Sequence, residues 1–281
     1  MNKTYFRDHS GRPHVVIRIL IYILVGYLGL CLMVFFMQRG MLYLPSKTSL
    51  SLDLRRQGLA AWPQQADCLG FIGGADHEGA RGTVLVFHGN AGSAIDRDYY
   101  VDALGDLGFR VILAEYPGYG ARSGKPNQTR LANQAQQMVH LAHEQFGGPL
   151  FLWGESLGAG VVAAAAGQDS TNIDGLILLT PWYALTDLAQ SIYWFLPARW
   201  LLLDRYESGK YLRTYAGPVA VLLAERDDIV PTRQGQKLYD SLATNKRRWV
   251  FEGAGHNTWP SYREAVWWRE VMDFVSAPNP E

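Results

Sequence analysis

Residues 149–167 read PLFLWGESLGAGVVAAAAG, an apolar run followed by a glycine-rich turn and a stretch of small residues. The run predicts a buried strand that ends at Gly154, and the small residues predict a helix that packs closely on that strand. Ser156 lies between them in the pattern G-E-S-L-G, where a sharp strand-to-helix turn needs flanking glycines and lifts the serine hydroxyl above the sheet. Because the pentapeptide alone is a weak signal, the strand and the helix around it carry the prediction that Ser156 is a nucleophile.

From residue 67 onward the chain repeats one alternation. Short apolar or β-branched runs are followed by glycine-rich turns and helix-like segments, which is typical of a mostly parallel central sheet with helices on both faces. The expected strands are 68–72, 83–87, 110–114, 149–153, 175–179, 218–223 and 248–252, and the expected helices are 93–107, 128–146, 157–168, 232–245 and 261–275. We therefore predict one α/β domain over residues 67–281.

One interval, about 182–216, interrupts this alternation. Its centre, residues 192–203, reads IYWFLPARWLLL and is dense in Trp, Phe and Leu. Long insertions in compact domains are usually functional, so we interpret the interval as a short lid insertion over a site. The alternative is that the interval is ordinary core.

The N-terminal part of the chain contains a long apolar run. Residues 19–37 read ILIYILVGYLGLCLMVFFM without a charge, and at helical rise they reach about 28 Å, close to the thickness of a bilayer's hydrocarbon core. A secretory signal would be shorter and would end in a small-x-small cleavage site, and a core helix is rarely so long and so uniformly apolar. The sequence predicts a tail over 1–18, an uncleaved transmembrane anchor over 19–37 and a connector over 38–66.

The charges that flank the anchor bear on its orientation. The tail carries Lys3, Arg7, Arg12 and Arg18 against a lone acidic residue, Asp8, and a similar number of basic residues follows the anchor. Charge bias acts mainly through short segments, whereas long domains cross the membrane regardless. We favour a single-pass membrane protein with its tail in the cytoplasm and its catalytic domain on the extracytoplasmic side.

Composition argues against several classes of function. Basic and acidic residues number 26 each, so no net field favours a nucleic acid. The two cysteines, Cys31 and Cys68, predict neither a disulfide nor a metal site. His140 and His143 stand near Glu144 on an expected helix and lack a fourth ligand, so we expect no metal. The glycines of GYGARSG lack the lysine of a phosphate loop, so we expect no nucleotide and no cofactor.

A serine hydroxyl is a poor nucleophile at neutral pH and needs a base that is oriented by a third group. After a serine of this kind the chain order is acid and then histidine, and His256 is the one histidine that follows Ser156. The acid should end the strand before it, where VLLAERDDIVP offers Asp227 and Asp228. One of them could orient the imidazole while the other caps the following turn.

An acyl-transfer site also needs two N–H donors for the oxyanion. We expect one from Leu157, at the start of the helix, and the other from Asn90, in the turn HGNAGS that follows the strand TVLVF. His88 in the same turn is interpreted as a residue that braces the loop. Trp182 and Tyr183, at the start of the insertion, are expected to line the mouth of the substrate site.

From about residue 68 to its end the chain resembles the α/β-hydrolase superfamily, and in detail its small membrane-anchored serine hydrolases, which are depalmitoylase-like or S33-peptidase-like. The motifs that carry the resemblance are RGMLYLPS after the anchor, HGNAG at 88–92, YPGYGARSGKP at 116–126, GESLGAG at 154–160, ERDDIVP at 225–231 and GAGHN at 253–257. In that family the acid precedes one variable residue, two aliphatic residues and a proline, which selects Asp227. Glu115, where relatives often carry aspartate, departs from the pattern outside the triad.

The resemblance implies an α/β-hydrolase fold and a serine hydrolase that transfers an acyl group to water through an acyl-enzyme on Ser156. The expected substrate is a small-molecule or lipid-like ester or thioester, with an acylated protein as a further option. One alternative is a serine aminopeptidase, which would need a carboxylate such as Glu115, Glu155 or Asp187 to hold the substrate amine. A less favoured alternative is a non-catalytic binding domain.

Overall fold

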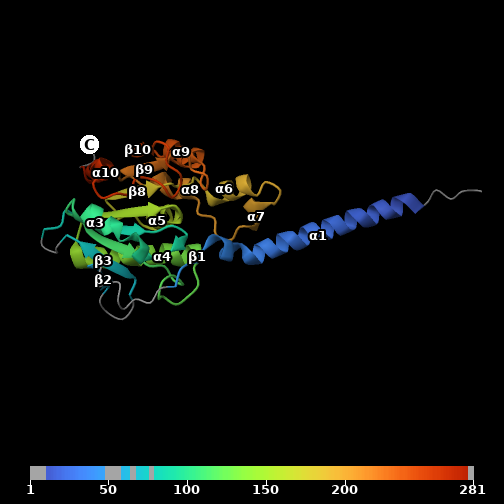
Figure 1. The fold of residues 1–281 in the computed structure, drawn as a ribbon, viewed down its shortest axis with the longest axis horizontal. Coiled ribbons are helices and arrows are strands. Elements are labelled where there is room, and N and C mark those ends of the chain that lie inside the picture. Colours follow the sequence, from blue (N-terminus) through green and yellow to red (C-terminus); the bar gives the residue numbers. More distant parts are fainter. Residues whose placement is uncertain (1–10, 48–57, 64–67, 76–78, 278–281) are drawn as a thin grey trace, which may run out of the picture.

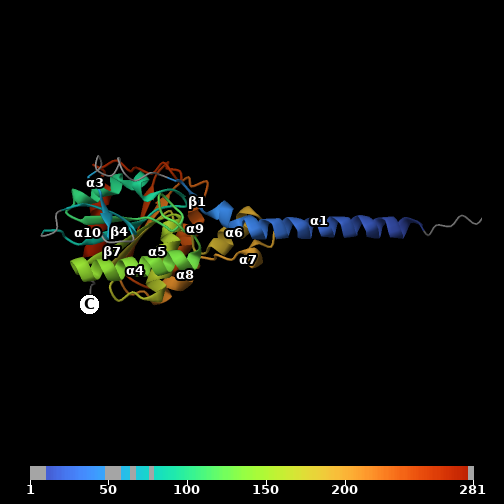
Figure 2. The ribbon, with the colours of Figure 1, turned by 90° about the horizontal axis from the view of Figure 1, so that it is seen from below.

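The computed structural model describes residues 11–47, 58–63, 68–75 and 79–277 (Figure 1). A sheet-based domain carries one long helix that projects away from it in both views (Figures 1 and 2). Residues 1–10 of the predicted tail, with Lys3, Arg7 and Asp8, and residues 48–57 and 64–66 of the predicted connector lie outside the described residues.

An eight-stranded sheet forms the centre of the domain, in the order β10-β9-β8-β7-β4-β6-β3-β2. Neighbouring strands from β10 to β6 are parallel, whereas β3 pairs antiparallel with β6 and β2 pairs antiparallel with β3. The strands are β2 (Ala60–Trp62), β3 (Gly70–Gly74), β4 (Thr83–Phe87), β6 (Arg110–Ala114), β7 (Leu150–Glu155), β8 (Gly175–Leu179), β9 (Val219–Ala224) and β10 (Lys246–Phe251). The predicted mostly parallel sheet is confirmed.

Helices cover both faces of this sheet, because successive side chains of a strand point to opposite sides. Leu85 and Phe87 of β4 share a core with α4 (Gln128–Phe146), α5 (Leu157–Gln168) and α9 (Thr232–Ser241). Val84 and Val86 share the opposite core with the 3-10 helix η1 (Ala94–Arg97), α3 (Tyr99–Gly105) and α10 (Val266–Ser276). Strands buried on both faces need apolar side chains at almost every position, which explains the continuous apolar runs of the sequence.

The chain changes its direction across the sheet between β4 and β7. From β4 it moves outward to β6, and from β7 it moves the other way through β8 and β9 to β10. In open α/β sheets, the loops at the carboxyl ends of the strands diverge at such a switch point and leave a crevice in which ligands bind. Ser156 follows β7 directly at this point.

Helix α1 (Gly11–Leu42) precedes the domain and extends beyond both ends of the predicted anchor at 19–37. The most apolar part of Val15–Leu42 has a mean hydropathy of 2.6 and is only 6% buried, so α1 is long and apolar enough to cross a bilayer. The described residues of the predicted connector include two short strands. After the last turn of α1, β1 (Leu44–Pro45) pairs in parallel with β5 (Ala91–Gly92), and β2 forms the edge of the large sheet.

The interval 182–216 forms two groups of short helices. One group, α6 (Leu185–Ile192) and α7 (Ala198–Leu201), lies beside the domain end of α1 in both views (Figures 1 and 2). The other group, α8 (Ser208–Tyr211) and η2 (Leu212–Thr214), packs on α5. The second group belongs to the core, as the alternative interpretation had it, whereas the lid role of the first group stays a prediction.

Three expected helices have different bounds in the structure, and one of them, expected at 261–275, is α10 at Val266–Ser276. The segment 93–107 divides into η1 and α3, and the segment 232–245 ends at Ser241. The ammonium of Lys246 donates to the carbonyls of Tyr239 and Leu242 at 2.8 and 2.7 Å. The last carbonyls of a helix have no N–H partner within the helix. The Lys246 ammonium serves as a partner for the carbonyls of Tyr239 and Leu242, where the helix ends earlier than expected.

Candidate active site

Ser156 lies at the turn between β7 and α5, in a backbone conformation that residues other than glycine rarely adopt. Its φ is 53° and its ψ is −109°. The glycines around it are required by space, because a Cβ on Gly154 would stand 2.5 Å from Ala159 and a Cβ on Gly158 would stand 1.8 Å from the carbonyl oxygen of Phe87. Backbone strain of this kind persists only where the surrounding structure holds it, and it clusters at functional sites.

Hydrogen bonds join Ser156 to His256 and His256 to Asp227. The Nε2 atom of His256 lies 3.0 Å from the Oγ of Ser156, and its Nδ1 atom lies 2.7 Å from the Oδ2 of Asp227. Ser156 and His256 are each 8% exposed, and the Asp227 side chain is 2% exposed. An ionised carboxylate only accepts, so Nδ1 carries the proton and Nε2 is left to accept from the serine hydroxyl.

Asp227 uses both of its carboxylate oxygens. While Oδ2 faces His256, Oδ1 accepts the N–H groups of Ile229 and Val230 at 3.0 and 2.7 Å. Asp228 is exposed. Asp227 therefore both faces the imidazole and caps the turn, two contacts that the sequence left open between Asp227 and Asp228.

The two residues expected to serve the oxyanion lie at the ends of β7 and β4. Leu157 begins α5, and the first N–H groups of a helix have no carbonyl partner within it. The side-chain amide of Asn90 donates to the carbonyl of Leu42 at 3.2 Å, and its own carbonyl accepts from the Leu44 N–H at 2.9 Å and the Tyr119 hydroxyl at 2.7 Å. These contacts fix the loop and leave the backbone N–H as the donor that Asn90 can contribute.

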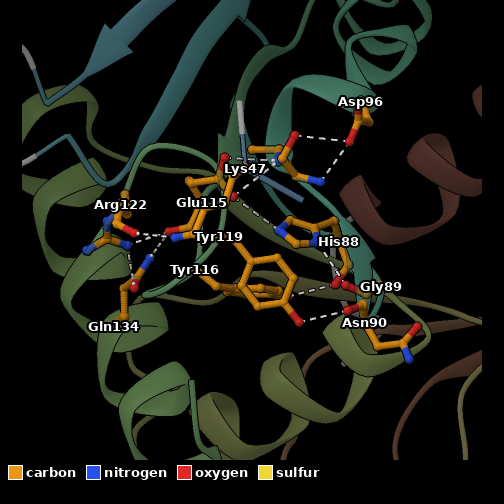
Figure 3. Close-up of polar contacts among 12 residues, drawn as sticks. Lys47, His88, Gly89, Asn90, Asp96, Glu115, Tyr116, Tyr119, Arg122 and Gln134 are labelled. Carbon is orange, nitrogen blue, oxygen red and sulfur yellow. Dashed lines mark hydrogen bonds and ion pairs between the residues drawn. The ribbon is translucent and has the colours of Figure 1, made fainter. Parts of the chain in front are cut away.

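A buried polar network holds the loop after β4 (Figure 3). His88 and Glu115 are each 1% exposed, and the Nε2 of His88 lies 3.5 Å from the Oε1 of Glu115. The Nδ1 of His88 lies 2.8 Å from the carbonyl oxygen of Gly89, and the Tyr116 hydroxyl donates to the His88 carbonyl at 2.8 Å. Burial raises the pKa of Tyr116 well above its ordinary value, so the phenol remains a donor. These contacts fit the bracing role expected for His88.

The same network holds Glu115 from its other side (Figure 3). The Glu115 carbonyl accepts from the amide of Gln134 at 2.8 Å and from the guanidinium of Arg122. Its carboxylate accepts the N–H of Ala94 at 3.3 Å. Lys47, in the segment that follows α1, donates to the Arg122 carbonyl at 3.2 Å. Glu115 is thus fixed within the domain by groups from several elements.

A second ion pair, which the sequence analysis missed, lies beside Ser156. The guanidinium of Arg97 donates to the carboxylate of Glu155 at 3.0 and 3.1 Å, and the hydroxyls of Tyr99 and Tyr100 donate to it at 3.3 Å. Burial raises the pKa of both tyrosines, so they stay donors. Burial lowers the pKa of Arg97, but the Glu155 charge outweighs it and leaves that pKa above its ordinary value. The partners are 58 residues apart, and no local spacing could have revealed them.

Trp182 and Tyr183, which are expected to line the substrate mouth, both pack within the domain, and their role toward a substrate stays a prediction. Trp182 is buried and donates to the carbonyl of Tyr206 at 3.2 Å. Tyr183 lies against Gly209, and the ammonium of Lys237 stands 4.1 Å from the centre of its ring. Neither side chain lines the apolar cavity that lies between α1 and residues 185–202.

The polar residues considered for metal binding are separate from this site. His140, His143 and Glu144 are exposed on α4. Within the part of the chain that the structure describes, no three His, Cys, Asp or Glu side chains are grouped so as to hold a metal ion. Cys31 and Cys68 are free thiols.

Comparison with known proteins gives relatives for most of the domain. Residues 78–216 match the protein family described as serine aminopeptidase, S33. An uncharacterised protein of Mycobacterium tuberculosis is 36% identical over 182 residues, which are 64% of each chain. Lysophosphatidylserine lipase ABHD12 of Danio rerio is 32% identical over 182 residues, which are 58% of this chain and 48% of the lipase. The matched part therefore spans less than two thirds of the length of either relative.

Two solved structures illustrate the likeness of the fold. An esterase from Pyrococcus furiosus superposes with a TM-score of 0.62 at 15% identity and covers 83% of this chain and 97% of its own. A monoacylglycerol lipase from Paleococcus ferrophilus superposes with a TM-score of 0.56 at 21% identity and covers 73% of this chain and 96% of its own. Similarity at this level concerns the arrangement of the sheet and its helices.

Proposed function

We propose that the chain is a member of the α/β-hydrolase superfamily and a membrane-anchored serine hydrolase that cleaves a carboxylic ester or thioester, which the family match and the similar lipase support. The observation that carries the proposal is the continuous hydrogen-bond chain from Asp227 through His256 to Ser156. The names of the relatives, a lysophosphatidylserine lipase, a monoacylglycerol lipase and an esterase, support an acyl ester as the substrate class.

The first half of the reaction forms an acyl-enzyme. The Oγ of Ser156 attacks the acyl carbonyl carbon while the Nε2 of His256 takes the hydroxyl proton. Asp227 keeps Nδ1 protonated and stabilises the imidazolium that forms. The backbone N–H groups of Leu157 and Asn90 receive the negative charge of the tetrahedral intermediate. The imidazolium then protonates the leaving alcohol or thiol, and the acyl group stays on Ser156.

The second half repeats these steps with water as the nucleophile. His256 takes a proton from the water that attacks the acyl carbonyl, and the same two N–H groups receive the oxyanion. As the intermediate collapses, the imidazolium returns its proton to Ser156 and the carboxylic acid leaves. Proton transfer and charge stabilisation are all that this route requires of the protein.

The S33 family description raises a second function, the cleavage of an amide next to a free amino terminus. An aminopeptidase needs a carboxylate that can hold the ammonium of its substrate. Glu115 is fixed in the network around His88, Glu155 is paired with an arginine, and Asp187 is paired with Arg199 and Lys237 at 2.9 and 2.7 Å. Since each of these carboxylates already has partners, the ester or thioester is the favoured substrate.

We also propose that α1 anchors the enzyme as a single membrane span, with the domain on the extracytoplasmic side. The exposed apolar surface of Val15–Leu42 supports the anchor. Labelling of a Ser241→Cys variant by a membrane-impermeant maleimide in intact cells, in a protein whose free thiols Cys31 and Cys68 are changed to serine, tests the side. Labelling before lysis is expected, and labelling only after lysis would reverse the orientation.

The test of the activity combines a covalent probe with a substrate panel. A fluorophosphonate should label the full-length protein in detergent, and Ser156→Ala should abolish both labelling and ester hydrolysis. Ser191→Ala, at an exposed serine of α6, is the matched control and should behave like the wild type. p-Nitrophenyl esters of graded chain length, assayed beside aminoacyl anilides, separate the two functions. Turnover of the anilides alone would favour the aminopeptidase, and labelling that persists in Ser156→Ala would refute Ser156 as the nucleophile.

A further inference from the structure

The last turns of α1 are fastened to the insertion by polar contacts. The side-chain amide of Gln38 donates to the carbonyl of Leu201 at 3.1 Å and accepts the N–H of Leu203 at 2.8 Å. The guanidinium of Arg39 donates to both oxygens of the Asp204 carboxylate at 2.9 and 3.2 Å. The anchor and the insertion therefore form one rigid border of the domain.

A cavity of about 170 Å³ lies inside this border. One wall is α1, with Val34, Met41 and Leu42, and the other is the insertion, with Leu188, Ala189 and other apolar side chains up to residue 202. Apolar cavities of about 150 Å³ take up apolar molecules as large as benzene. The space suits a run of several methylene groups.

The cavity is adjacent to the loop that is proposed to receive the oxyanion. The carbonyl of Leu42, a residue of the cavity wall, accepts the side-chain amide of Asn90 at 3.2 Å. Two residues later, the N–H of Leu44 donates to the Asn90 carbonyl at 2.9 Å, and Leu44 pairs with Ala91 between β1 and β5. The end of α1 thus contacts both the cavity and the loop.

The surface beside the cavity carries exposed aromatic side chains that lie against the anchor. Trp194 and Trp200 are 78% and 87% exposed, and Phe195 is half exposed. These aromatic side chains belong to the segment that lies against α1, and the Tyr27 hydroxyl of α1 donates to the Phe195 carbonyl at 3.0 Å. Tyr27 lies in the middle of the apolar run 19–37, so a bilayer around α1 would reach this face of the insertion.

The chemistry of the cavity wall selects its occupant. Gln38 is the one amide side chain of the wall, and both ends of its amide are engaged by the insertion. A peptide segment would bring backbone N–H and C=O groups that need partners, and a buried group without a partner costs free energy. A hydrocarbon chain has no such requirement, and the bilayer that surrounds α1 supplies it.

We propose that this cavity binds part of the acyl chain of a membrane lipid, and that α1 is one wall of the acyl-binding site as well as the anchor. The substrate is then a long-chain acyl ester that enters from the bilayer between α1 and the insertion. This inference rests on the proposed hydrolase function for its catalytic consequence, whereas the binding of the chain does not require catalysis.

Binding is tested first, in a protein that cannot turn over. Ser156→Ala at full length is placed in phosphatidylcholine vesicles with palmitic acid that carries a photoreactive diazirine at mid-chain, and the cross-linked residues are mapped by mass spectrometry. Leu188 and Leu196 line the cavity and are only 5% exposed, so cross-links there report a chain inside it. Cross-links confined to the exposed face of α1, or cross-links to a second copy at the cavity, would overturn the proposal.

Catalysis is tested with variants that fill the cavity. Ala189→Phe should lower kcat/KM for a palmitoyl ester at least about tenfold more than kcat/KM for a butyryl ester, the size of effect expected when methylene groups lose an apolar pocket. Ala189→Leu should have a smaller effect in the same direction and guards against misfolding. Ser191→Phe places the same ring on the exposed side of α6 and should behave like the wild type.

The outcomes separate the inference from the proposed function. Loss of the palmitoyl preference together with loss of the Leu188 and Leu196 cross-links supports the acyl site. Equal loss of activity on both esters in Ala189→Leu, or an unchanged preference in Ala189→Phe, overturns it. A wild-type protein that cleaves no ester while the cross-links persist would refute the proposed function and leave the binding site intact.

Discussion

Replacing Asp227 with asparagine separates the two tasks of this side chain. The amide oxygen can still accept the N–H groups of Ile229 and Val230, which now bond to Oδ1, so the turn keeps its shape. The amide nitrogen takes the position of Oδ2 and faces Nδ1 of His256 with a donor where an acceptor stood. His256 then carries its proton on Nε2 and meets Ser156 with a donor, which cannot take the serine proton.

The expected size of the effect follows from this geometry. A wrong imidazole tautomer in a Ser-His-Asp arrangement lowers kcat by about 10⁴, which corresponds to roughly 5 kcal/mol of barrier. Asp227→Ala removes the two turn hydrogen bonds as well, so its free energy of unfolding should fall by about 1–3 kcal/mol. Asp227→Asn should therefore lose activity without losing stability, and Asp227→Ala should lose both.

The assay compares steady-state kcat on a short p-nitrophenyl ester with thermal unfolding in the same detergent. Asp228→Asn is the matched control, and because Asp228 is exposed its kcat should stay within about twofold of the wild type. If Asp228→Asn lost more activity than Asp227→Asn, the acid would be wrongly assigned. If Asp227→Asn unfolded as early as Asp227→Ala, the account of the preserved turn would fail.

Three further outcomes are expected. Gly158→Ala should lower the free energy of unfolding by about 2 kcal/mol or more, because its Cβ meets a backbone oxygen, whereas Gly79→Ala, with open space around it, should show no such loss in thermal unfolding. Arg39→Ala leaves the Asp204 carboxylate, only 6% exposed, without its cation, with the Gln128 N–H still donating to it, so thermal unfolding should show a loss of about 1–3 kcal/mol in the free energy of unfolding, part of which the added change Asp204→Asn restores. A protein without residues 1–37 should leave the membrane fraction yet float weakly with liposomes through the exposed tryptophans of the insertion, and a complete lack of flotation would contradict a lipid-facing insertion.

Much of the fold could be predicted because its strands are buried on both faces. β4, β6 and β8 have the expected bounds, since each is a continuous apolar run between glycine-rich turns. Helix α4 also has the expected bounds of 128–146, and Asn127 caps its start by accepting the N–H of Arg130 at 3.0 Å. Local chemistry marks the ends of these elements, so a single sequence reveals them.

The site was predictable where a motif has a geometric cause, and unpredictable where contacts are remote. The turn at Ser156 has room only for glycine at positions 154 and 158, so the five residues GESLG predict it. Two ion pairs could not be predicted, because their partners are far apart in the sequence and no local pattern links them. Arg97 and Glu155 are 58 residues apart, and Arg39 and Asp204 are 165 residues apart. The two contacts of Asp227 could not be predicted for another reason. A residue pattern does not show that one carboxylate oxygen binds the imidazole while the other caps the turn.

The hydrogen bonds between α1 and the insertion limit which sequences can replace the membrane anchor of this protein. Membrane anchors are commonly exchanged between proteins as if only length and apolarity counted. Each residue inserted into an α-helix turns everything before it by about 100°, so one extra residue between Arg39 and Tyr43 would carry Gln38 and Arg39 around the helix and away from Leu201 and Asp204. A chimaeric anchor therefore has to keep the final two turns of α1 in register with the insertion, whatever sequence precedes them.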